Sequence, residues 1–286
     1  MRLSVRLVEF DVFVILEHYM AQIENKMFHV KHFIQNELNK TLAIWCVLLY
    51  HISMQEKLKT IFNSAGIALT DLQVNQFMEY YNLLIDYNKM FNLTAITEPV
   101  DVFVKHFVDS ALPFKEIGEG ANVIDVGTGA GFPLIPLKIM RPDLKITLVD
   151  AINKRVEFLN AVVTRLKFDD VKCIHSRAED LAKNGDYREM YDVCVARAVA
   201  KLNTLAEITL PFVKLKGKLM AYKSDVESEL LGAKRALAIL GGKLDKILSF
   251  ELPLGLGSRT VVVINKVAHS PIKYPRGQNK PKSNPL

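Results

Sequence analysis

The sequence has few of the residues that mark secreted or metal-binding proteins. Its 286 residues include only three cysteines, Cys46, Cys173 and Cys194, and no Cys-x-x-Cys pair. An odd number of cysteines without paired spacing argues against a disulfide framework, so we expect reduced thiols and a cytoplasmic protein. The seven histidines form no His-x-x-x-His pattern and no Cys/His cluster, and we therefore expect no metal site.

Long apolar runs are also lacking. The longest, Leu42–Tyr50, is well short of the roughly 20 residues that a membrane-spanning helix needs. Glu9 and Asp11 interrupt the early apolar stretch, which argues against a signal peptide. We expect no association with a membrane.

Charge of one sign does not dominate either. The 37 basic and 31 acidic side chains give a net charge of +6, which permits an anionic partner without requiring one. The exception is residues 268–286, a basic tail with three Lys, one Arg and no acidic residue. Two explanations are open for this tail: a disordered, solvated segment, or a segment that contacts RNA phosphates.

Residues 1–53 differ from the rest of the chain, because they lack clear helix caps and their apolar runs have no partner pattern. Met27–His32 can be encoded by ATG TTT CAC GTG AAA CAT, a palindrome that resembles the centromere-like site of bacterial chromosome-partition proteins. Our hypothesis is that residues 1–53 are translated upstream DNA and that Met54 is the natural start. A genuine, weakly ordered extension is the alternative.

After Met54 the patterns become regular. Gln55–Ala65 suits a short helix, and Thr70 with Gln73 forms a capping box that opens a helix reaching about Met90. We therefore expect residues 54–115 to form a small helical segment and residues 116–267 to form the main domain.

In that domain, short β-rich runs alternate with helical ones. The predicted helices are Phe132–Met140, Asn153–Leu166, Leu202–Val213 and Val226–Leu240. The predicted strands are Asn122–Val126, Lys145–Asp150, Val171–Ser176, Asp192–Ala196, Lys218–Lys223, Leu244–Glu251 and Arg259–Lys266. This alternation predicts an α/β fold with a doubly wound, mostly parallel seven-stranded sheet, whose last two strands could form an antiparallel hairpin.

The most informative segment is the loop that follows the first strand. Gly127, Gly129 and Gly131 stand at alternate positions between a strand and a helix. A dinucleotide-binding fold needs Gly-x-Gly-x-x-Gly, and the sixth position counted from Gly127 is Phe132. The Asp-x-Gly-x-Gly-x-Gly form instead resembles the first motif of class I S-adenosylmethionine-dependent methyltransferases, which have a Rossmann-like fold.

Two further segments fit that interpretation. Asp150 ends the second strand, where a carboxylate can accept hydrogen bonds from ribose hydroxyls, although it could also cap the helix at Asn153. Ala178 and Glu179 follow the third strand, near the usual position of the adenine. Without this fold, Glu179 would simply be a first-turn helix acid.

Several short segments together make the resemblance specific. The chain resembles the glucose-inhibited division protein B family, the bacterial 16S rRNA guanine-N7 methyltransferases. The resemblance extends from Met54 to about Arg276, and no counterpart of residues 1–53 is apparent. The matching segments are Asn92–Ile96, His106–Ser110, Gly127–Pro133, Asn153–Arg155, Arg177–Glu179, Ala196–Ala200 and Lys273–Arg276.

The resemblance implies S-adenosyl-L-methionine as cofactor, with contacts at Gly127, Phe132, Ala178, Glu179 and Arg197. It also implies methylation of guanine N7 in 16S rRNA or the small ribosomal subunit. Guanine N7 carries a lone pair and no proton, so we expect no nucleophile and no acid–base pair. We expect a monomer.

Candidates on the substrate side remain open. Arg197 follows the fourth strand and could meet the cofactor carboxylate, a phosphate or guanine O6, or be an exposed surface residue. His106 and Asn92 could line the substrate site or be structural. Lys223 could reach a phosphate or be solvated. Other possible phosphate contacts are Lys154, Arg155, Arg165, Lys167, Lys273, Arg276, Lys280 and Lys282.

Three alternatives to a ribosomal RNA methyltransferase are kept. A methyltransferase could act on a small molecule or a protein, and steep salt dependence of substrate binding would argue against that. A non-catalytic RNA-binding assembly factor could keep the fold, although the intact loop and Asp150 argue against it. A nicotinamide oxidoreductase is disfavoured by the failed dinucleotide motif.

Overall fold

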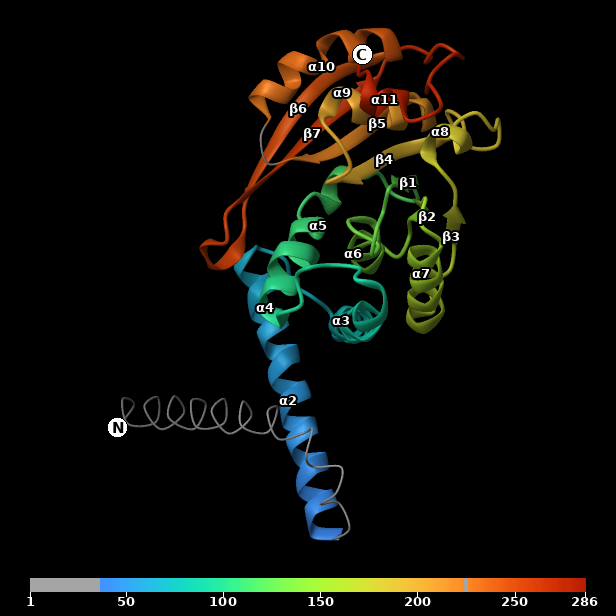
Figure 1. Ribbon diagram of the computed structural model, residues 1–286. Coiled ribbons are helices and arrows are strands. Elements are labelled where there is room, and N and C mark those ends of the chain that lie inside the picture. Colours follow the sequence, from blue (N-terminus) through green and yellow to red (C-terminus); the bar gives the residue numbers. More distant parts are fainter. Residues whose placement is uncertain (1–36, 224–225) are drawn as a thin grey trace. The chain divides into compact units, whose positions relative to one another are not determined.

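The computed structural model describes residues 37–223 and 226–286 (Figure 1). The chain divides into two compact units, Met1–Glu56 and Lys57–Leu286. The hypothesis that residues 1–53 are translated upstream DNA falls largely on residues 1–36, which lie outside the described residues. Among the described residues, no helix is long and apolar enough to cross a membrane.

The first described helix, α2, runs from Glu37 to Ser64. The sequence predicted a helix only over Gln55–Ala65, and its predicted beginning was wrong. The reason is local, because no Gly or Pro interrupts the chain between Glu37 and Ser64 and nothing else in that stretch ends a helix. Beyond α2, Gly66 adopts a left-handed backbone conformation with φ of 74°.

The predicted capping box is confirmed. Helix α3 spans Asp71–Phe91, with the Thr70 side chain accepting from the Gln73 N–H and the Gln73 side chain accepting from the Thr70 N–H. The chain then passes through short helical turns that the sequence did not predict. These turns are α4 (Pro99–Val102), the π-helical η1 (Phe103–Val108), α5 (Asp109–Ala111) and the 3-10 turn η2 (Phe114–Glu116).

The predicted seven-stranded sheet is also confirmed. Its strand order is β3-β2-β1-β4-β5-β7-β6, with β1 to β5 parallel and β7 antiparallel to both of its neighbours. The order reverses between β1 and β4, so ligands are expected beyond the carboxyl ends of these strands. The strands are β1 (Asn122–Val126), β2 (Lys145–Asp150), β3 (Val171–His175), β4 (Tyr191–Arg197), β5 (Val213–Lys223), β6 (Gly242–Glu251) and β7 (Ser258–Lys266).

Helices cover both faces of the sheet (Figure 1). On one side lie α3, α6 (Leu134–Met140) and α7 (Asn153–Leu166), and on the other α9 (Leu202–Thr209) and α10 (Glu227–Leu240). The short elements between them are α8 (Ala178–Leu181), the 3-10 turns η3 (Leu210–Phe212) and η4 (Pro253–Gly255), and the C-terminal α11 (Lys280–Ser283).

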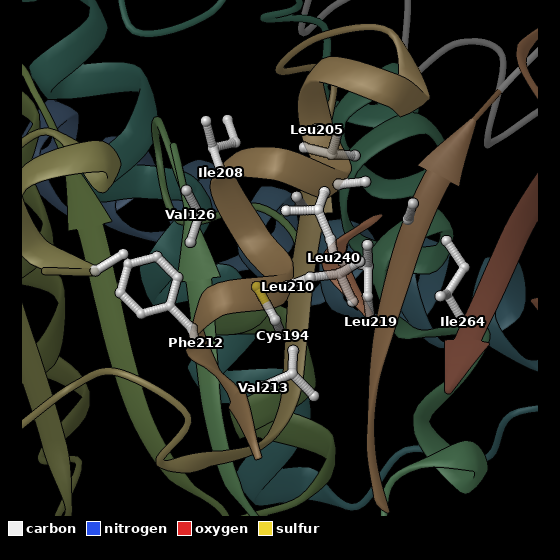
Figure 2. Close-up of a cluster of buried hydrophobic side chains, with 14 of the residues drawn as sticks. Val126, Cys194, Leu205, Ile208, Leu210, Phe212, Val213, Leu219, Leu240 and Ile264 are labelled. Carbon is white, nitrogen blue, oxygen red and sulfur yellow. The ribbon is translucent and has the colours of Figure 1, made fainter. Parts of the chain in front are cut away.

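The core under α9 and α10 includes apolar residues from five strands, β1, β2, β4, β5 and β7, and from both helices. Figure 2 shows Val126, Cys194, Leu219 and Ile264 of the sheet facing Leu205 and Leu240 of the helices. All six of these side chains are at most 2% exposed. Burial on this scale holds the strand ends, and hence the loops beyond them, in fixed positions.

The three cysteines are free, and the basic tail is packed against the domain. Cys46, Cys173 and Cys194 are free thiols, as the sequence predicted. The tail is not a solvated, disordered segment, because Tyr274 and Pro281 are buried and Leu286 packs against the core cluster. That explanation of the basic tail is therefore wrong.

Candidate active site

The glycine loop connects β1 to α6 and has the backbone that its sequence predicts. Gly127, Gly129 and Gly131 adopt φ values of 71°, 61° and 94°, a region that side chains rarely tolerate. A Cβ atom on Gly127 would lie 3.1 Å from Cγ2 of Val199, which is tight. Gly127 therefore lets the loop after β4 approach the loop after β1.

Asp150 ties the end of β2 to this loop. Its carboxylate is 3% exposed and accepts from the N–H groups of Gly129 and Ile152, each at 2.9 Å. Arg155 adds a longer contact of 3.3 Å to Oδ2. Ile152 is the N-cap residue of α7, so Asp150 binds the N–H at the start of this helix as well as the glycine loop.

A first cavity of about 180 Å³ lies at the carboxyl ends of β1, β2 and β3. It brings together four of the predicted cofactor residues: Gly127, Asp150, Ala178 and Glu179. The other predicted cofactor residues, Gly129, Gly131, Phe132 and Arg197, do not line it. Val199, Ala200 and three residues of the C-terminal tail also line it, together with Thr204 and Ile208 of α9.

A second cavity of about 600 Å³ adjoins the first, because Val199 and Ala200 line both. Among the side chains that line it are four basic ones, two acidic ones and one histidine: Lys105, Arg197, Lys223, Arg259, Asp109, Glu229 and His106. The backbone is strained at this junction, since Ala198 has a φ of 56°. Strain of this kind persists only where the surrounding structure enforces it.

Arg197 is held in place by a buried carboxylate. Its Nη1 donates to Oδ2 of Asp109 at 2.8 Å and to the carbonyl of Lys105 at 3.1 Å. Arg259 binds the other oxygen of Asp109. The Asp109 side chain is fully buried, while those of Arg197 and Arg259 are 12% and 23% exposed. Arg197 is therefore not the exposed surface residue that the sequence left open.

Phe132 serves as a platform beside this ion-pair network. Its side chain is 6% exposed. The His106 ring stacks on it with centroids 4.4 Å apart, and the Arg197 guanidinium lies 4.9 Å from the Phe132 centroid. The position of Phe132 therefore orients the two predicted substrate-side residues.

His106 is kept neutral. Its Nδ1 lies 3.2 Å from Nη2 of Arg197, which can only donate, and 3.1 Å from the carbonyl of Lys105, which can only accept. Nε2 in turn lies 3.0 Å from Oγ1 of Thr94. Burial, reinforced by the Arg197 charge, lowers the pKa of His106 to about 3. This histidine sits on the π-helical turn η1, an irregularity often found at functional sites.

Asp125 lies beneath the glycine loop. Its carboxyl group is fully buried, and Thr128 Oγ1 donates to it at 2.7 Å. Burial raises the pKa of Asp125 to about 8. The acid of the loop motif is thus a structural group under the loop rather than part of the cavity lining.

Several of the basic residues that could have contacted phosphates are paired with carboxylates of the protein. Arg276 binds the buried Glu207, and Lys223 binds Glu229 at 2.7 Å with a side chain 9% exposed. Lys223 is thus neither solvated nor free to reach a phosphate. Arg165 pairs with Glu79. Asn92 ends α3 in a left-handed conformation, is exposed and lines neither cavity.

Comparisons with known proteins agree with this geometry. The family model described as rRNA small subunit methyltransferase G (GidB) matches residues 73–259. The ribosomal RNA small subunit methyltransferase G of Leuconostoc citreum is 48% identical over 229 residues, covering 78% of this chain and 95% of the relative. That of Staphylococcus aureus strain Newman is 48% identical over 224 residues, covering 77% and 93%.

The chain belongs to the rRNA small subunit methyltransferase G family. The resemblance found in the short motifs is thereby confirmed. A solved S-adenosylmethionine-dependent O-methyltransferase from Thermotoga maritima is similar with a TM-score of 0.45 and 15% identity, covering 66% of this chain and 72% of that one. Among the described residues, no group of three or more His, Cys, Asp or Glu is placed to hold a metal ion.

For this methyltransferase G family member, sequence reasoning missed three features of the site. Asp109 is part of the matching segment His106–Ser110, but nothing in that segment indicates that it binds two guanidinium groups. Arg259 begins a strand and carries no local signal. Of the tail residues that line the first cavity, Asn279, Pro281 and Lys282, the sequence singled out only Lys282, as a possible phosphate contact.

Proposed function

We propose that this chain transfers a methyl group from S-adenosylmethionine to N7 of a guanine in 16S rRNA of the small ribosomal subunit. The observation that carries the proposal is the pair of adjoining cavities at the switch point of the sheet, in a member of this family. Such an activity belongs in the cytoplasm, and we keep the expectation of a monomer.

The first cavity fits the adenosine part of the cofactor. Gly127 lines it with backbone alone, and Asp150 and Glu179 bring carboxylates to the cavity. Oδ1 of Asp150 accepts one N–H, from Ile152, so a second lone pair is available for a ribose hydroxyl. When bound, the cofactor supplies a methyl group on a positively charged sulfur.

The second cavity fits a guanine and the phosphates beside it. Arg197 has five N–H groups, and Nη1 uses two of them on Lys105 and Asp109, which leaves donors on Nη2 and Nε for guanine O6 or a phosphate. Arg259 adds a second guanidinium, and Asp109 fixes both. A neutral His106 does not compete for a proton, in keeping with a reaction at N7 that needs no general base.

Rate enhancement in this arrangement comes mainly from positioning. Holding N7 in line with the methyl group can supply up to about 7–11 kcal/mol. The fixed guanidinium groups, the stacked His106 and the buried Phe132 are suited to that task because their own positions are set by packing.

The test uses the purified full chain with radiolabelled S-adenosylmethionine. Small subunits are offered from a strain that lacks the gene and from the wild-type strain. Label should enter 16S RNA only in the first, because the wild-type site is already methylated, and mapping should place it at guanine N7. Cofactor binding without label in either would overturn the ribosomal assignment and favour a small-molecule or protein substrate.

A further inference from the structure

The C-terminal tail forms part of the first cavity. Asn279, Pro281 and Lys282 line it together with Gly127, Asp150 and Glu179, although more than 90 residues separate these segments. The fold and the motifs of the methyltransferase account for the strand-end residues. They do not account for the tail.

An ion pair anchors the tail just before these residues. The Glu207 side chain in α9 is fully buried. It accepts from Arg276 three times: from the backbone N–H at 2.9 Å, from Nε at 2.8 Å and from Nη2 at 2.6 Å. Nη2 of Arg276 also donates to the carbonyl of Asn284 at 2.8 Å. One guanidinium therefore fixes both ends of the segment that lines the cavity.

A second anchor lies within the cavity wall itself. Thr204 of α9, 6% exposed, donates through Oγ1 to the carbonyl of Pro281 at 2.9 Å. Thr204 and Ile208 also line the cavity, so α9 and the tail form one continuous wall. Because this wall is held by buried groups, it is a built part of the site rather than a chance contact.

The chemistry of this wall suits a purine. Asn279 carries an amide with both donor and acceptor, the combination that pairs with the N6/N7 edge of adenine. Pro281 and the aliphatic part of Lys282 offer apolar surface, and the charged end of Lys282 can stay in water. Asn279 has a φ of 59°, a conformation that asparagine tolerates better than most residues.

We propose that residues 279–282 are a fixed part of the cofactor site and contact the adenine of S-adenosylmethionine. The Asn279 amide hydrogen-bonds the adenine edge, and Pro281 with the Lys282 stem packs against the ring. This inference rests on the proposed function, since it assigns the tail to the cofactor of that reaction.

The test measures binding of S-adenosylhomocysteine and of its inosine counterpart, whose ring lacks the 6-amino group, to the full chain by calorimetry. Asn279→Gly removes the amide and suits the left-handed backbone. Its matched control is Gln278→Gly, at a φ of 58° but outside the cavity lining. Likewise, Lys282→Ala is compared with Lys280→Ala, because Lys280 lies on the same short helix without lining the cavity.

We expect Asn279→Gly to raise the Kd for the adenine compound about 10-fold and to remove most of the preference over the inosine compound. Lys282→Ala should raise the Kd about 3-fold, and both controls should match wild type. Asn279→Gly with the affinity and base preference of its control would overturn the inference. Failure of the wild-type chain to bind either compound would instead count against the proposed function.

Discussion

At the scale of single residues, the three loop glycines are needed for different reasons. Gly127 accommodates Val199, whereas a Cβ on Gly129 would meet nothing within 4 Å. A Cβ on Gly131 would lie 2.6 Å from Cγ1 of Ile135 and 2.9 Å from the Tyr80 hydroxyl. That hydroxyl donates to the Ala130 carbonyl, so α3 and the loop are locked together at Gly131.

Gly131→Ala should therefore destabilise the fold much more than Gly129→Ala. We expect a loss of about 3 kcal/mol at Gly131, from overpacking added to backbone strain. At Gly129 only the cost of a left-handed backbone at a residue with a Cβ remains, about 1 kcal/mol. Urea unfolding of both variants without cofactor measures the difference. Equal losses would contradict the contacts at Gly131.

His106 should make the free energy of unfolding depend on pH. Its pKa is lowered from 6.5 to about 3 in the folded chain. Between these values the unfolded chain binds one more proton, so stability falls as pH falls through this window. Asp125 acts with the opposite sign, because its pKa is raised from 3.8 to about 8. Only the difference between a variant and wild type isolates His106.

The variant His106→Gln should show a shallower loss of stability on acidification. Its amide can keep a hydrogen bond to Thr94, and it cannot take up a proton. The expected difference in slope is at most about 1.4 kcal/mol per pH unit. Urea unfolding of both proteins at pH 7 and pH 5 measures it. Parallel curves would mean that His106 titrates normally in the folded state.

At the scale of secondary-structure elements, the capping box at the start of α3 could be recognised in the sequence. Gln73 completes the capping box with Thr70 and also donates to the carbonyl of Ile139 at the end of α6, at 3.2 Å. The cap thus fixes the helix start and links α3 to the helix that follows the cofactor loop. Its two residues are three positions apart, which is why the sequence predicted it.

Thr70→Ala should cost about 1 kcal/mol of stability, because it leaves a helix N–H without its acceptor. A suitable control is Thr164→Ala, an exposed position inside α7, where the change should stay within about 0.5 kcal/mol. Urea unfolding compares the two. A loss at Thr70 no larger than at Thr164 would mean that water replaces the cap without cost.

The end of α9 and the start of β5 differ from the bounds that the sequence predicted. The predicted helix Leu202–Val213 ends at Thr209 and continues as the 3-10 turn η3, which contains Pro211. Strand β5 then begins at Val213 instead of Lys218. The strand is longer because residues before Lys218 pack closely against β4. A Cβ on Gly217 would lie only 2.6 Å from the carbonyl oxygen of Asp192.

At the scale of the whole molecule, the alignment with the Leuconostoc citreum relative covers 78% of this chain and 95% of the relative. The expectation that Met54 is the natural start stays a prediction. Intact-mass measurement of protein expressed from its native locus should give a mass that begins at Met54. A mass that includes Met1 would end the hypothesis and leave a genuine extension.

The order of elements, the sheet and the cofactor end of the sheet follow from local patterns in the sequence. Strands β1 and β2 and helix α7 have the predicted bounds, because apolar periodicity and turn residues are local signals. The spacing of Gly127, Gly129 and Gly131 predicted the loop. Since the carboxyl ends of parallel strands meet at one edge, the positions of Asp150, Ala178 and Glu179 followed.

The roles of the charged side chains, in the site or in holding the fold, depend on contacts between segments that are distant in the sequence. Arg276 was a candidate phosphate contact, yet it pairs with Glu207, 69 residues away in the sequence. Asp109 joins Arg197 and Arg259, which lie 88 and 150 residues beyond it. Ion pairs between distant segments leave no periodic pattern, because they depend on where the folded chain places both partners. For the same reason, the place of the tail in the first cavity became visible only in three dimensions.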